Sequence, residues 1–372
     1  MKIGILTLPL EFNYGGILQA FALQTVLKSL GHEVYTIDRH DYNKYKSLTH
    51  HVKGYIHRLI LRVLYKKNVS IQWNPYMTQE EKDIVGANIK PFINKHITLT
   101  DFVFSNELEN IDKKYLFDTY VVGSDQIWLK GYCPNSFLDF VKRDGVKKII
   151  YAASCGKSSF MDDAKLVKVC RVLSKDFSGI SVREECLVER ASVVLGTEVN
   201  WVLDPTMLLD KNDYLKVINS HPKVKTPYVF SYVIDYSGYK KQIIEHVCNV
   251  TTFKSICNIV TKPGINEEIP KSVEEWLSLI SRANFIITDS FHGTVFAILF
   301  KIQFISIVNT ERGEGRFYSL LNMLGLQDRI ISGYDKKIID NLIEKQINFE
   351  LVDSRIEALR SHSIDFIKKH LR

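Results

Sequence analysis

The segment Thr288-Asp289-Ser290-Phe291-His292-Gly293-Thr294 offers the clearest chemistry in this chain. It lies between two apolar runs, 283–287 and 295–300, and this pattern predicts a buried strand, a polar turn and a buried helix. In a parallel α/β sheet such a turn lies at the carboxyl edge, where free N–H groups of the next helix bind anions. His292 can exchange protons near neutral pH, so we interpret it as a candidate catalytic residue. A helix-capping or core histidine is the structural alternative.

A glycine-containing loop near the start of the chain is a second candidate. Asn13, Gly15 and Gly16 follow the first predicted strand and precede a helix. Glycines allow close backbone approach, so the loop could contact a phosphate or a sugar. The loop lacks the G-x-G-x-x-G spacing of dinucleotide folds and the lysine of a P-loop, which disfavours NAD and ATP as ligands.

A third loop, Ser124-Asp125-Gln126, follows the apolar residues 120–122. Asp125 and Gln126 could hydrogen-bond sugar hydroxyls, and the nearby Trp128 could stack on a sugar ring. The alternative is an ordinary polar turn followed by a tryptophan that packs in the core.

Two further loops contain arginines that could bind an anion. Arg183 follows a predicted strand and stands at a helix start, where a cation is locally unfavourable. This placement indicates an anionic ligand, although a salt bridge with Glu184 or Asp204 would also explain it. Arg312 and Arg316 lie in a glycine-containing loop after a later strand. They could reach the same site or form surface ion pairs with neighbouring glutamates.

Strand-like and helix-like patterns alternate along most of the chain. This alternation predicts an α/β protein with mostly parallel sheets covered on both faces. The pattern restarts after residues 220–226, so we predict two Rossmann-like domains, 1–208 and 226–346. Residues 347–372 are expected to form a helix that packs back on the first domain. The strands are expected at 2–8, 33–38, 119–122, 148–153, 179–182, 200–203, 227–234, 253–260, 284–288 and 303–308.

Composition indicates a folded protein with room for two domains. The chain has 372 residues, of which 45% are hydrophobic and 24% charged, both ordinary for globular proteins. The net charge of +7 favours acidic ligands. The opening residues do not fit a signal peptide and no apolar run suits a membrane span, so we expect a cytoplasmic protein. The six cysteines show neither C-x-x-C pairs nor zinc spacing, so we expect reduced thiols and no metal.

Residues 39–67 depart from this pattern because they are strongly basic. They contain eight Lys or Arg, four His and one acidic residue, and Ile56, Leu59, Ile60, Val63 and Leu64 fall at helical spacing. A basic amphipathic helix can rest on an anionic membrane surface. The alternative is a helix whose apolar stripe faces the core. No nucleic-acid-binding motif accompanies the charge, so nucleic acid is not an expected partner.

Several motifs in this order and spacing resemble the polysaccharide pyruvyl transferase family. They are NYGGILQAFALQ, YVVGSDQIW, AASCGKSS, SVRE, VLDPTMLL and ITDSFHGTVFAI, and the similarity extends from about residue 3 to about 326. The resemblance implies a glycosyltransferase-B-like fold, in which two Rossmann-like domains face a cleft. It also implies transfer of pyruvate from phosphoenolpyruvate to a sugar diol. The product would be a cyclic ketal on a bacterial surface polysaccharide or its lipid-linked precursor.

The resemblance also assigns roles to residues of this chain. His292 matches the catalytic histidine of the family, and Arg183 matches an arginine that holds phosphoenolpyruvate. Many members have arginine where this chain has Ser290, so we expect Arg312 or Arg316 to compensate. Gly293 and Ser290 complete the expected donor site, and no cofactor is expected because phosphoenolpyruvate is a co-substrate. The acceptor is expected to contact Asn13, Gly15, Gly16, Ser124, Asp125 and Gln126.

Two other functions fit the same architecture. One is a glycosyltransferase with a nucleotide-sugar donor, which is disfavoured because residues 263–269 show no basic and acidic pair suited to a diphosphate and a ribose. The other is a carbohydrate-binding protein without catalysis. Thermal shift distinguishes all three, since a ligand stabilises the folded protein by RT ln(1 + [L]/Kd). Stabilisation by phosphoenolpyruvate supports the first function, by a nucleotide sugar the second, and by neither the third.

Overall fold

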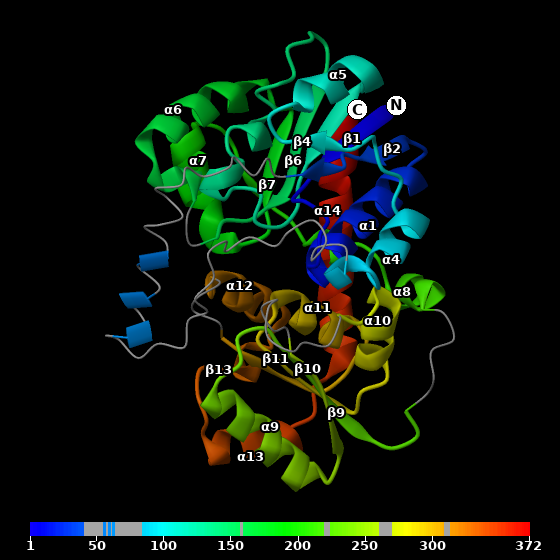
Figure 1. Ribbon diagram of the computed structural model, residues 1–372, viewed down its shortest axis with the longest axis vertical. Helices are drawn as coiled ribbons and strands as arrows, with labels where there is room; N and C mark the ends of the chain where they lie inside the picture. Colours follow the sequence, from blue (N-terminus) through cyan, green and yellow to red (C-terminus); the bar gives the residue numbers. More distant parts are fainter. Residues whose placement is uncertain are drawn as a thin grey trace.

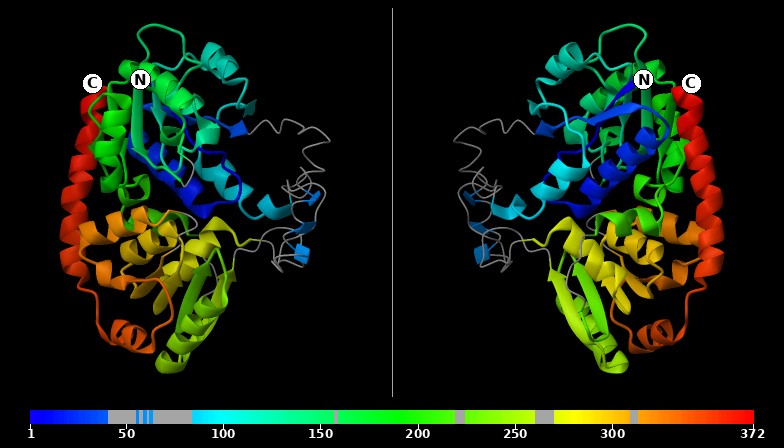
Figure 2. Two further views of the ribbon diagram at one scale, coloured as in Figure 1. Left: turned by 90° about the vertical axis from the view of Figure 1, so that its left-hand side faces the viewer. Right: turned by 90° about the vertical axis from the view of Figure 1, so that its right-hand side faces the viewer.

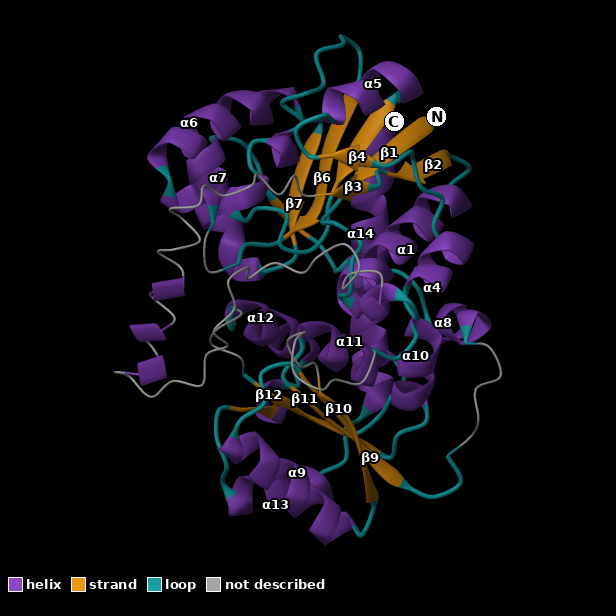
Figure 3. Ribbon diagram, in the orientation of Figure 1, coloured by secondary structure: helices purple, strands orange, loops and turns teal. Residues whose placement is uncertain are grey.

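The protein folds into two helix-covered parallel sheets that lie one above the other in the computed structural model (Figures 1 and 3). Strands and helices alternate in both, which confirms the predicted α/β class with two Rossmann-like domains. The structure describes three short pairs, 55–56, 59–60 and 62–63, and the ranges 1–40, 84–156, 159–218, 224–259, 270–308 and 313–372.

The first sheet has the strand order β2-β1-β5-β6-β7-β8, and all its ladders are parallel. All residues of β5 and β7 are buried, as expected for strands with helices on both faces. Two short strands, β3 (Arg39–His40) and β4 (Val103–Phe104), pair separately. The six strands of the sheet are β1 (Lys2–Leu6), β2 (Glu33–Thr36), β5 (Thr119–Val122), β6 (Lys147–Ala153), β7 (Gly179–Val182) and β8 (Asn200–Trp201).

The second sheet has the order β10-β9-β11-β12-β13 and is also parallel throughout. Its central strands β9, β11 and β12 are fully buried. Their continuous apolar character made them visible in the sequence. The strands are β9 (Tyr228–Val233), β10 (Lys254–Ile259), β11 (Phe285–Thr288), β12 (Phe304–Ile307) and β13 (Ile330–Ile331).

Helices cover both sheets (Figure 1). The first domain contains α1 (Tyr14–Ser29), α4 (Lys90–His96), α5 (Leu108–Tyr115), α6 (Ala164–Leu173), α7 (Val188–Leu195) and α8 (Lys211–Val217). The second domain contains α9 (Gly238–Thr251), α10 (Val273–Ser281), α11 (Phe291–Leu299), α12 (Gly315–Leu324) and α13 (Lys336–Glu344), and the chain ends with α14 (Phe349–Leu371). All nine residues of α11 are buried. This helix is apolar on every side because it packs between its own sheet and α1 of the first domain.

The C-terminal helix α14 runs along both domains (Figure 2). Near its end the Leu371 carbonyl accepts a hydrogen bond from Lys147 Nζ at 2.8 Å, and Ser363 Oγ accepts one from Leu203 N at 2.9 Å. In the second domain α14 packs against α12. These contacts confirm the prediction that the terminal helix braces the first domain.

All ten predicted strands are present, and their ends differ from the predictions by at most two residues. Sequence patterns did not indicate β3, β4 or β13. Each of these strands has two residues, which is too short for any periodicity to appear.

An aromatic contact joins the two domains at the first residue of α1. The Tyr14 ring stacks on Trp276 of α10 with centroids 5.0 Å apart and planes 14° apart. Its hydroxyl donates a hydrogen bond to the Lys271 carbonyl at 2.7 Å. A second contact lies elsewhere in the interface, where Glu185 N donates to Ser319 Oγ at 2.8 Å. The start of α1 is therefore fixed by the second domain as well as by the first.

Most of the basic stretch 39–67, including Leu64 of the predicted apolar stripe, lies outside the described residues. Within it, Ile56, Leu59, Ile60 and Val63 are described, and their side chains are exposed. These four residues do not pack in the core, so membrane contact stays a prediction. In the part of the chain that the structure describes, no helix combines the length and apolar character required to cross a bilayer.

Phe366 on α14 tests the importance of this helix for stability. Its side chain is 5% exposed and its ring faces Tyr151 of β6. We expect Phe366→Ala to lower the free energy of unfolding by about 3–5 kcal/mol, measured by denaturant and thermal unfolding. The control Leu351→Ala removes an exposed side chain of the same helix and should change stability by less than about 0.5 kcal/mol. Equal effects of the two substitutions would contradict the bracing role.

Candidate active site

Four acidic and basic side chains of the first domain meet at the carboxyl edge of its sheet. Arg183 follows β7 and donates from Nη1 to Asp204 Oδ2 at 2.6 Å and from Nη2 to Asp125 Oδ1 at 2.9 Å. Its Nε lies 3.5 Å from Glu184 Oε1. The Arg183 side chain is only 1% exposed. The salt-bridge alternative considered from the sequence is therefore present, with Asp125 as a further partner. A role for Arg183 in donor binding stays a prediction.

Burial and charge act in opposite directions on these groups. Burial alone would raise the pKa of Asp204, but His292 and Arg183 outweigh it and hold that pKa well below its usual value. Asp125 behaves similarly, since Arg183 and His292 overcome its burial and lower its pKa. For Arg183, burial is outweighed by Asp125 and Asp204, which raise its pKa. Two carboxylates and one guanidinium therefore stay ionised in a nearly dry site.

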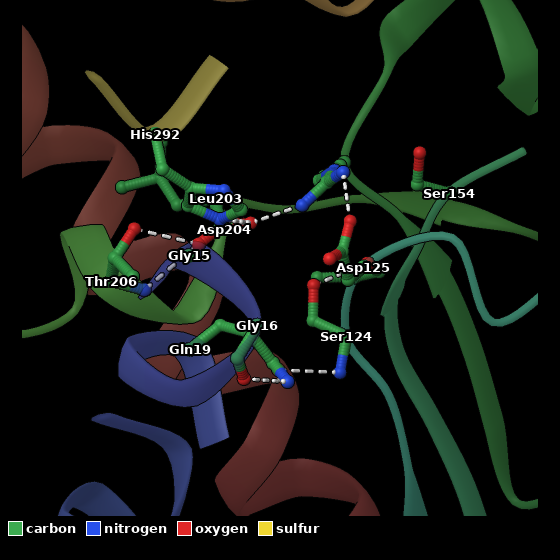
Figure 4. Close-up of polar contacts among 12 residues, drawn as sticks. Gly15, Gly16, Gln19, Ser124, Asp125, Ser154, Leu203, Asp204, Thr206 and His292 are labelled. Carbon is green, nitrogen blue, oxygen red and sulfur yellow. Dashed lines mark hydrogen bonds and ion pairs between the residues drawn. The ribbon is translucent and has the colours of Figure 1, made fainter. Parts of the chain in front are cut away.

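His292 reaches this cluster from the second domain. The Ser290 side chain caps α11 by accepting a hydrogen bond from Gly293 N at 3.3 Å, so His292 lies in the first turn of the helix. Its Nε2 lies 3.7 Å from Asp204 Oδ2, and the side chain is 7% exposed. Figure 4 shows His292 beside Asp204. Among the described residues, no group is within hydrogen-bond distance of this buried Nε2. The nitrogen is therefore placed to bond to a ligand.

Gly15 allows the close approach of His292. A Cβ atom on Gly15 would lie 1.9 Å from His292 Nδ1, so no other residue fits without displacing the imidazole. The same atom on Gly16 would lie 3.5 Å from the nearest atom, an ordinary contact. Asn13 caps α1 by accepting a hydrogen bond from Gly15 N at 3.1 Å. Gly15 is thus required for packing against the candidate catalytic histidine.

The loop after β5 is fixed by a buried glutamine. Gln19 of α1 accepts a hydrogen bond from Ser124 N at 2.8 Å, and Ser124 Oγ donates to the Ala152 carbonyl at 2.8 Å (Figure 4). Gln126 is partly buried beside them. Trp128 is fully buried and stacks on Phe137, with centroids 6.0 Å apart. The suggestion that Trp128 stacks on a sugar is therefore wrong, because the apolar core surrounds its ring.

A buried ion pair fixes the turn that carries His292. Asp289 accepts hydrogen bonds from Ile234 N at 2.6 Å and Asp235 N at 3.0 Å, and its other partner is Lys240 Nζ at 2.7 Å. The Asp289 side chain is fully buried. Gly293 has its own constraint, since a Cβ atom there would lie 2.3 Å from Thr288 Oγ1. The turn between β11 and α11 is thus held from two sides.

Of the two predicted compensating arginines, Arg316 lies close to the cluster. The guanidinium groups of Arg183 and Arg316 both lie near the Phe291 ring. The Arg183 guanidinium is 4.5 Å from the ring centroid, and the Arg316 guanidinium is 5.8 Å from it. Arg316 also contributes to the low pKa of Asp125, after Arg183 and His292. Arg312 lies outside the described residues, so its predicted role is untested.

The sequence was compared with models of known protein families. A sequence model described as polysaccharide pyruvyl transferase matches residues 13–311. The chain belongs to this family. The match confirms the predicted resemblance and identifies the protein as a transferase family member. No curated protein sequence gives a significant match.

Several solved structures similar to this pyruvyl transferase family member are UDP-GlcNAc 2-epimerases. The UDP-GlcNAc 2-epimerase from Neisseria meningitidis bound to UDP-GlcNAc has a TM-score of 0.55 at 10% identity, with 100% of this chain and 99% of that chain covered. A putative 2-epimerase from Listeria monocytogenes has 0.51 at 9% identity, covering 96% and 90%. The enzyme from Methanocaldococcus jannaschii has 0.50 at 15% identity, covering 94% and 93%. These similarities show the predicted glycosyltransferase-B-like fold.

Two residues at the site of this family member, Asp204 and Gln19, were not predicted as site residues from the sequence. Asp204 appeared only as a possible partner of Arg183, although it contacts His292 and accepts from Thr206 Oγ1 at 2.6 Å. Gln19 was not proposed for the site. Both left a signal: Asp204 follows a predicted strand at the same sheet edge as Arg183, and Gln19 interrupts an apolar helix. Within the described ranges, His, Cys, Asp and Glu form no group of three or more suited to a metal ion.

Gly15→Ala tests the contact between α1 and His292. We expect the added methyl group to displace the imidazole, to cost about 1–3 kcal/mol in stability and to lower transferase turnover roughly 100-fold. Thermal unfolding and steady-state kinetics measure these effects. Gly16→Ala is the matched control for stability and should keep the wild-type unfolding midpoint. A Gly15→Ala protein with normal turnover would show that His292 does not need this position.

Proposed function

We propose that this protein transfers pyruvate from phosphoenolpyruvate to a sugar diol and forms a cyclic ketal. The target is a bacterial surface polysaccharide or its lipid-linked precursor. The observation that carries the proposal is the buried His292 Nε2, which has no hydrogen-bond partner among the described residues and lies 3.7 Å from the ionised Asp204 carboxylate. Family membership supplies the transferase class. The position of His292 where the two domains meet supports a role for it in proton transfer.

Ketal formation requires proton transfer. Once the methylene carbon of phosphoenolpyruvate is protonated, C2 becomes electrophilic and a sugar hydroxyl attacks it. A second hydroxyl then displaces phosphate. In our proposal His292 Nε2 accepts the proton of the attacking hydroxyl, and Asp204 stabilises the imidazolium that forms. A positioned general base contributes roughly 10²- to 10⁴-fold in rate.

Donor binding requires cations because phosphoenolpyruvate carries a carboxylate and a phosphate. Arg316 and the positive end of α11 are the described groups best placed to meet this charge. The predicted role of Arg183 requires the donor to compete with Asp125 and Asp204 for its guanidinium. Ser290 caps α11, so in our proposal it shapes the anion site and Arg316 supplies the charge.

The acceptor sugar is proposed to bind on the first-domain side. Asn13 is exposed and Gln126 is partly exposed, so both can reach hydroxyl groups. Gly16 would contribute its backbone N–H beside them, whereas Ser124 N is already bonded to Gln19, so Ser124 would shape this side of the site. The reaction needs no separate cofactor, since phosphoenolpyruvate supplies both the pyruvyl group and the leaving phosphate. We propose that the protein acts in the cytoplasm, and at the inner face of the membrane if its acceptor is lipid-linked.

A nucleotide-sugar transferase is the second candidate because one similar structure holds UDP-GlcNAc. A nucleotide-sugar donor would need a cation to hold its diphosphate, and Lys240 at the start of α9 is a candidate. Its Nζ donates to Asp289 at 2.7 Å and to the Asp235 carbonyl at 2.7 Å. Because Lys240 is already paired with Asp289, it is not available to hold a diphosphate. A sugar-binding protein without catalysis would gain nothing from a desolvated His292. Both alternatives are therefore weaker.

The proposed reaction can be tested directly with phosphoenolpyruvate and a panel of simple and lipid-linked galactosides. We expect phosphate release and a product heavier than the acceptor by pyruvic acid less water. His292→Gln should abolish turnover and keep donor binding, since the substitution removes a proton acceptor. Phosphate assay, mass spectrometry and thermal shift with phosphoenolpyruvate measure these outcomes.

His246→Gln is the matched control for this test. His246 also pairs with a carboxylate, Asp340, at 2.7 Å, but lies on α9 away from the cluster. It should keep wild-type turnover. A wild-type protein stabilised by a nucleotide sugar and not by phosphoenolpyruvate would favour the second candidate. Wild-type turnover in His292→Gln would refute the role of His292.

Arg183→Lys separates donor binding from organisation of the carboxylates. A lysine cannot reproduce the fork of contacts, so we expect donor affinity to fall at least tenfold, about 1.4 kcal/mol. Titration calorimetry measures the affinity. Arg190→Lys, in an exposed pair with Asp162, is the control. Unchanged affinity with reduced kcat would show that Arg183 only holds Asp125 and Asp204 in place.

A further inference from the structure

Glu184 is a buried carboxyl group with one oxygen that lacks a partner. Its Oε1 accepts a hydrogen bond from Ser154 Oγ at 2.5 Å and lies 3.5 Å from Arg183 Nε. Its Oε2 is buried, and no described residue lies within hydrogen-bond distance of it. The Glu184 side chain is 5% exposed. A bare, desolvated carboxylate oxygen is unfavourable, whereas a protonated one can donate to a ligand.

The surroundings of Glu184 differ from those of Asp125 and Asp204. Burial raises its pKa, and the opposing effects of Arg183, Ser154 and Arg316 do not fully compensate. Burial raises the pKa of the nearby Cys155 and Cys186 thiols, and the charge of an ionised Glu184 would raise both further. Arg183 is thus shared among three carboxyl groups, and its two closer contacts go to Asp204 and Asp125. The third, Glu184, is the one whose environment favours the neutral acid.

Ketal formation by the proposed route needs an acid as well as a base. The acid protonates the methylene carbon of phosphoenolpyruvate before any hydroxyl can attack. His292, paired with the ionised Asp204, is placed to accept a proton. A second group must therefore donate one. A chain of contacts runs from Glu184 through Arg183 and Asp204 to His292, so an acid and a base stand at the two ends of one cluster.

We propose that Glu184 is the general acid that protonates the methylene carbon of phosphoenolpyruvate. This inference rests on the proposed pyruvyl transfer. The proton moves from Oε2 to C3 as the C–H bond forms and the C2–C3 π bond is lost. The first sugar hydroxyl adds to C2 and its proton goes to His292. The second hydroxyl then adds as the C2–O bond to phosphate breaks, and its proton returns to the Glu184 carboxylate. Phosphate takes the proton held by His292 as it leaves, which restores the neutral imidazole.

Ser154 has a positioning role in this scheme. Its hydroxyl donates to Oε1 and leaves Oε2 for the proton. Because this hydrogen bond favours the ionised form, it lowers the pKa of Glu184. Removal of the hydroxyl should therefore raise that pKa. A general acid works only while protonated, so the rate is lost as pH rises through its pKa. Ser154→Ala should move this alkaline limb of the kcat profile to higher pH.

The test compares Glu184→Gln and Glu184→Asp with wild-type protein. Glutamine keeps the shape but cannot supply the proton, so kcat should fall about 100-fold or more with phosphoenolpyruvate affinity within twofold. Its residual rate should lack the alkaline limb. Aspartate keeps a carboxyl group and should retain the limb at reduced rate. Glu185→Gln is the matched control, since the adjacent Glu185 is exposed, and it should keep wild-type kinetics.

Several results would overturn the assignment. Wild-type kcat in Glu184→Gln would exclude proton donation, and weaker donor binding with unchanged kcat would show that Glu184 only holds Arg183. If Glu184→Gln does not fold, an alkaline limb that fails to move in Ser154→Ala overturns the proposal. Wild-type protein that neither binds phosphoenolpyruvate nor releases phosphate would refute the proposed function itself. Turnover by wild-type and Glu184→Gln alike refutes only the role of Glu184.

Discussion

The structure depends on the burial of one guanidinium. Removal of the Arg183 charge from water is costly unless carboxylates and hydrogen bonds replace the lost solvation. Asp125 and Asp204 supply the opposite charge and Glu184 Oε1 accepts a hydrogen bond, and these three residues come from three loops of one sheet edge. The spacing of those loops is therefore fixed by charge as well as by the apolar core. The position of Asp204, and with it the environment of His292, follows from this constraint.

The second domain completes the cluster through packing. Tyr14 and Gly15 are consecutive residues of α1; the first stacks on Trp276 and the second contacts His292. The same turn of helix thus joins the domains and sets the distance between the histidine and Asp204. A shift of one domain relative to the other would change both contacts together. Domain arrangement and proton transfer are coupled at this point.

The fold was more predictable from the sequence than the site. Buried parallel strands appear as continuous apolar runs, so strands such as β5 and β7 were placed correctly to the residue. His292 and Arg183 stood out because polar residues after such strands lie at one sheet edge. Trp128 was ambiguous, since an indole next to a polar loop can face a ligand or the core. The bonds of Asp125 to Arg183 and of Ser154 to Glu184 were not predicted, because they join loops far apart in the sequence, which periodicity does not encode.

The exclusion of solvent from this cluster has a consequence for competing reactions. The side chains of Arg183, Asp204 and His292 are between 1% and 7% exposed. A cationic carbon formed during pyruvyl transfer would react with water as readily as with a sugar hydroxyl. With bulk water kept out, the acceptor is the nucleophile in contact with that carbon. The dry interior would thus protect phosphoenolpyruvate from wasteful hydrolysis and make its consumption depend on a bound sugar.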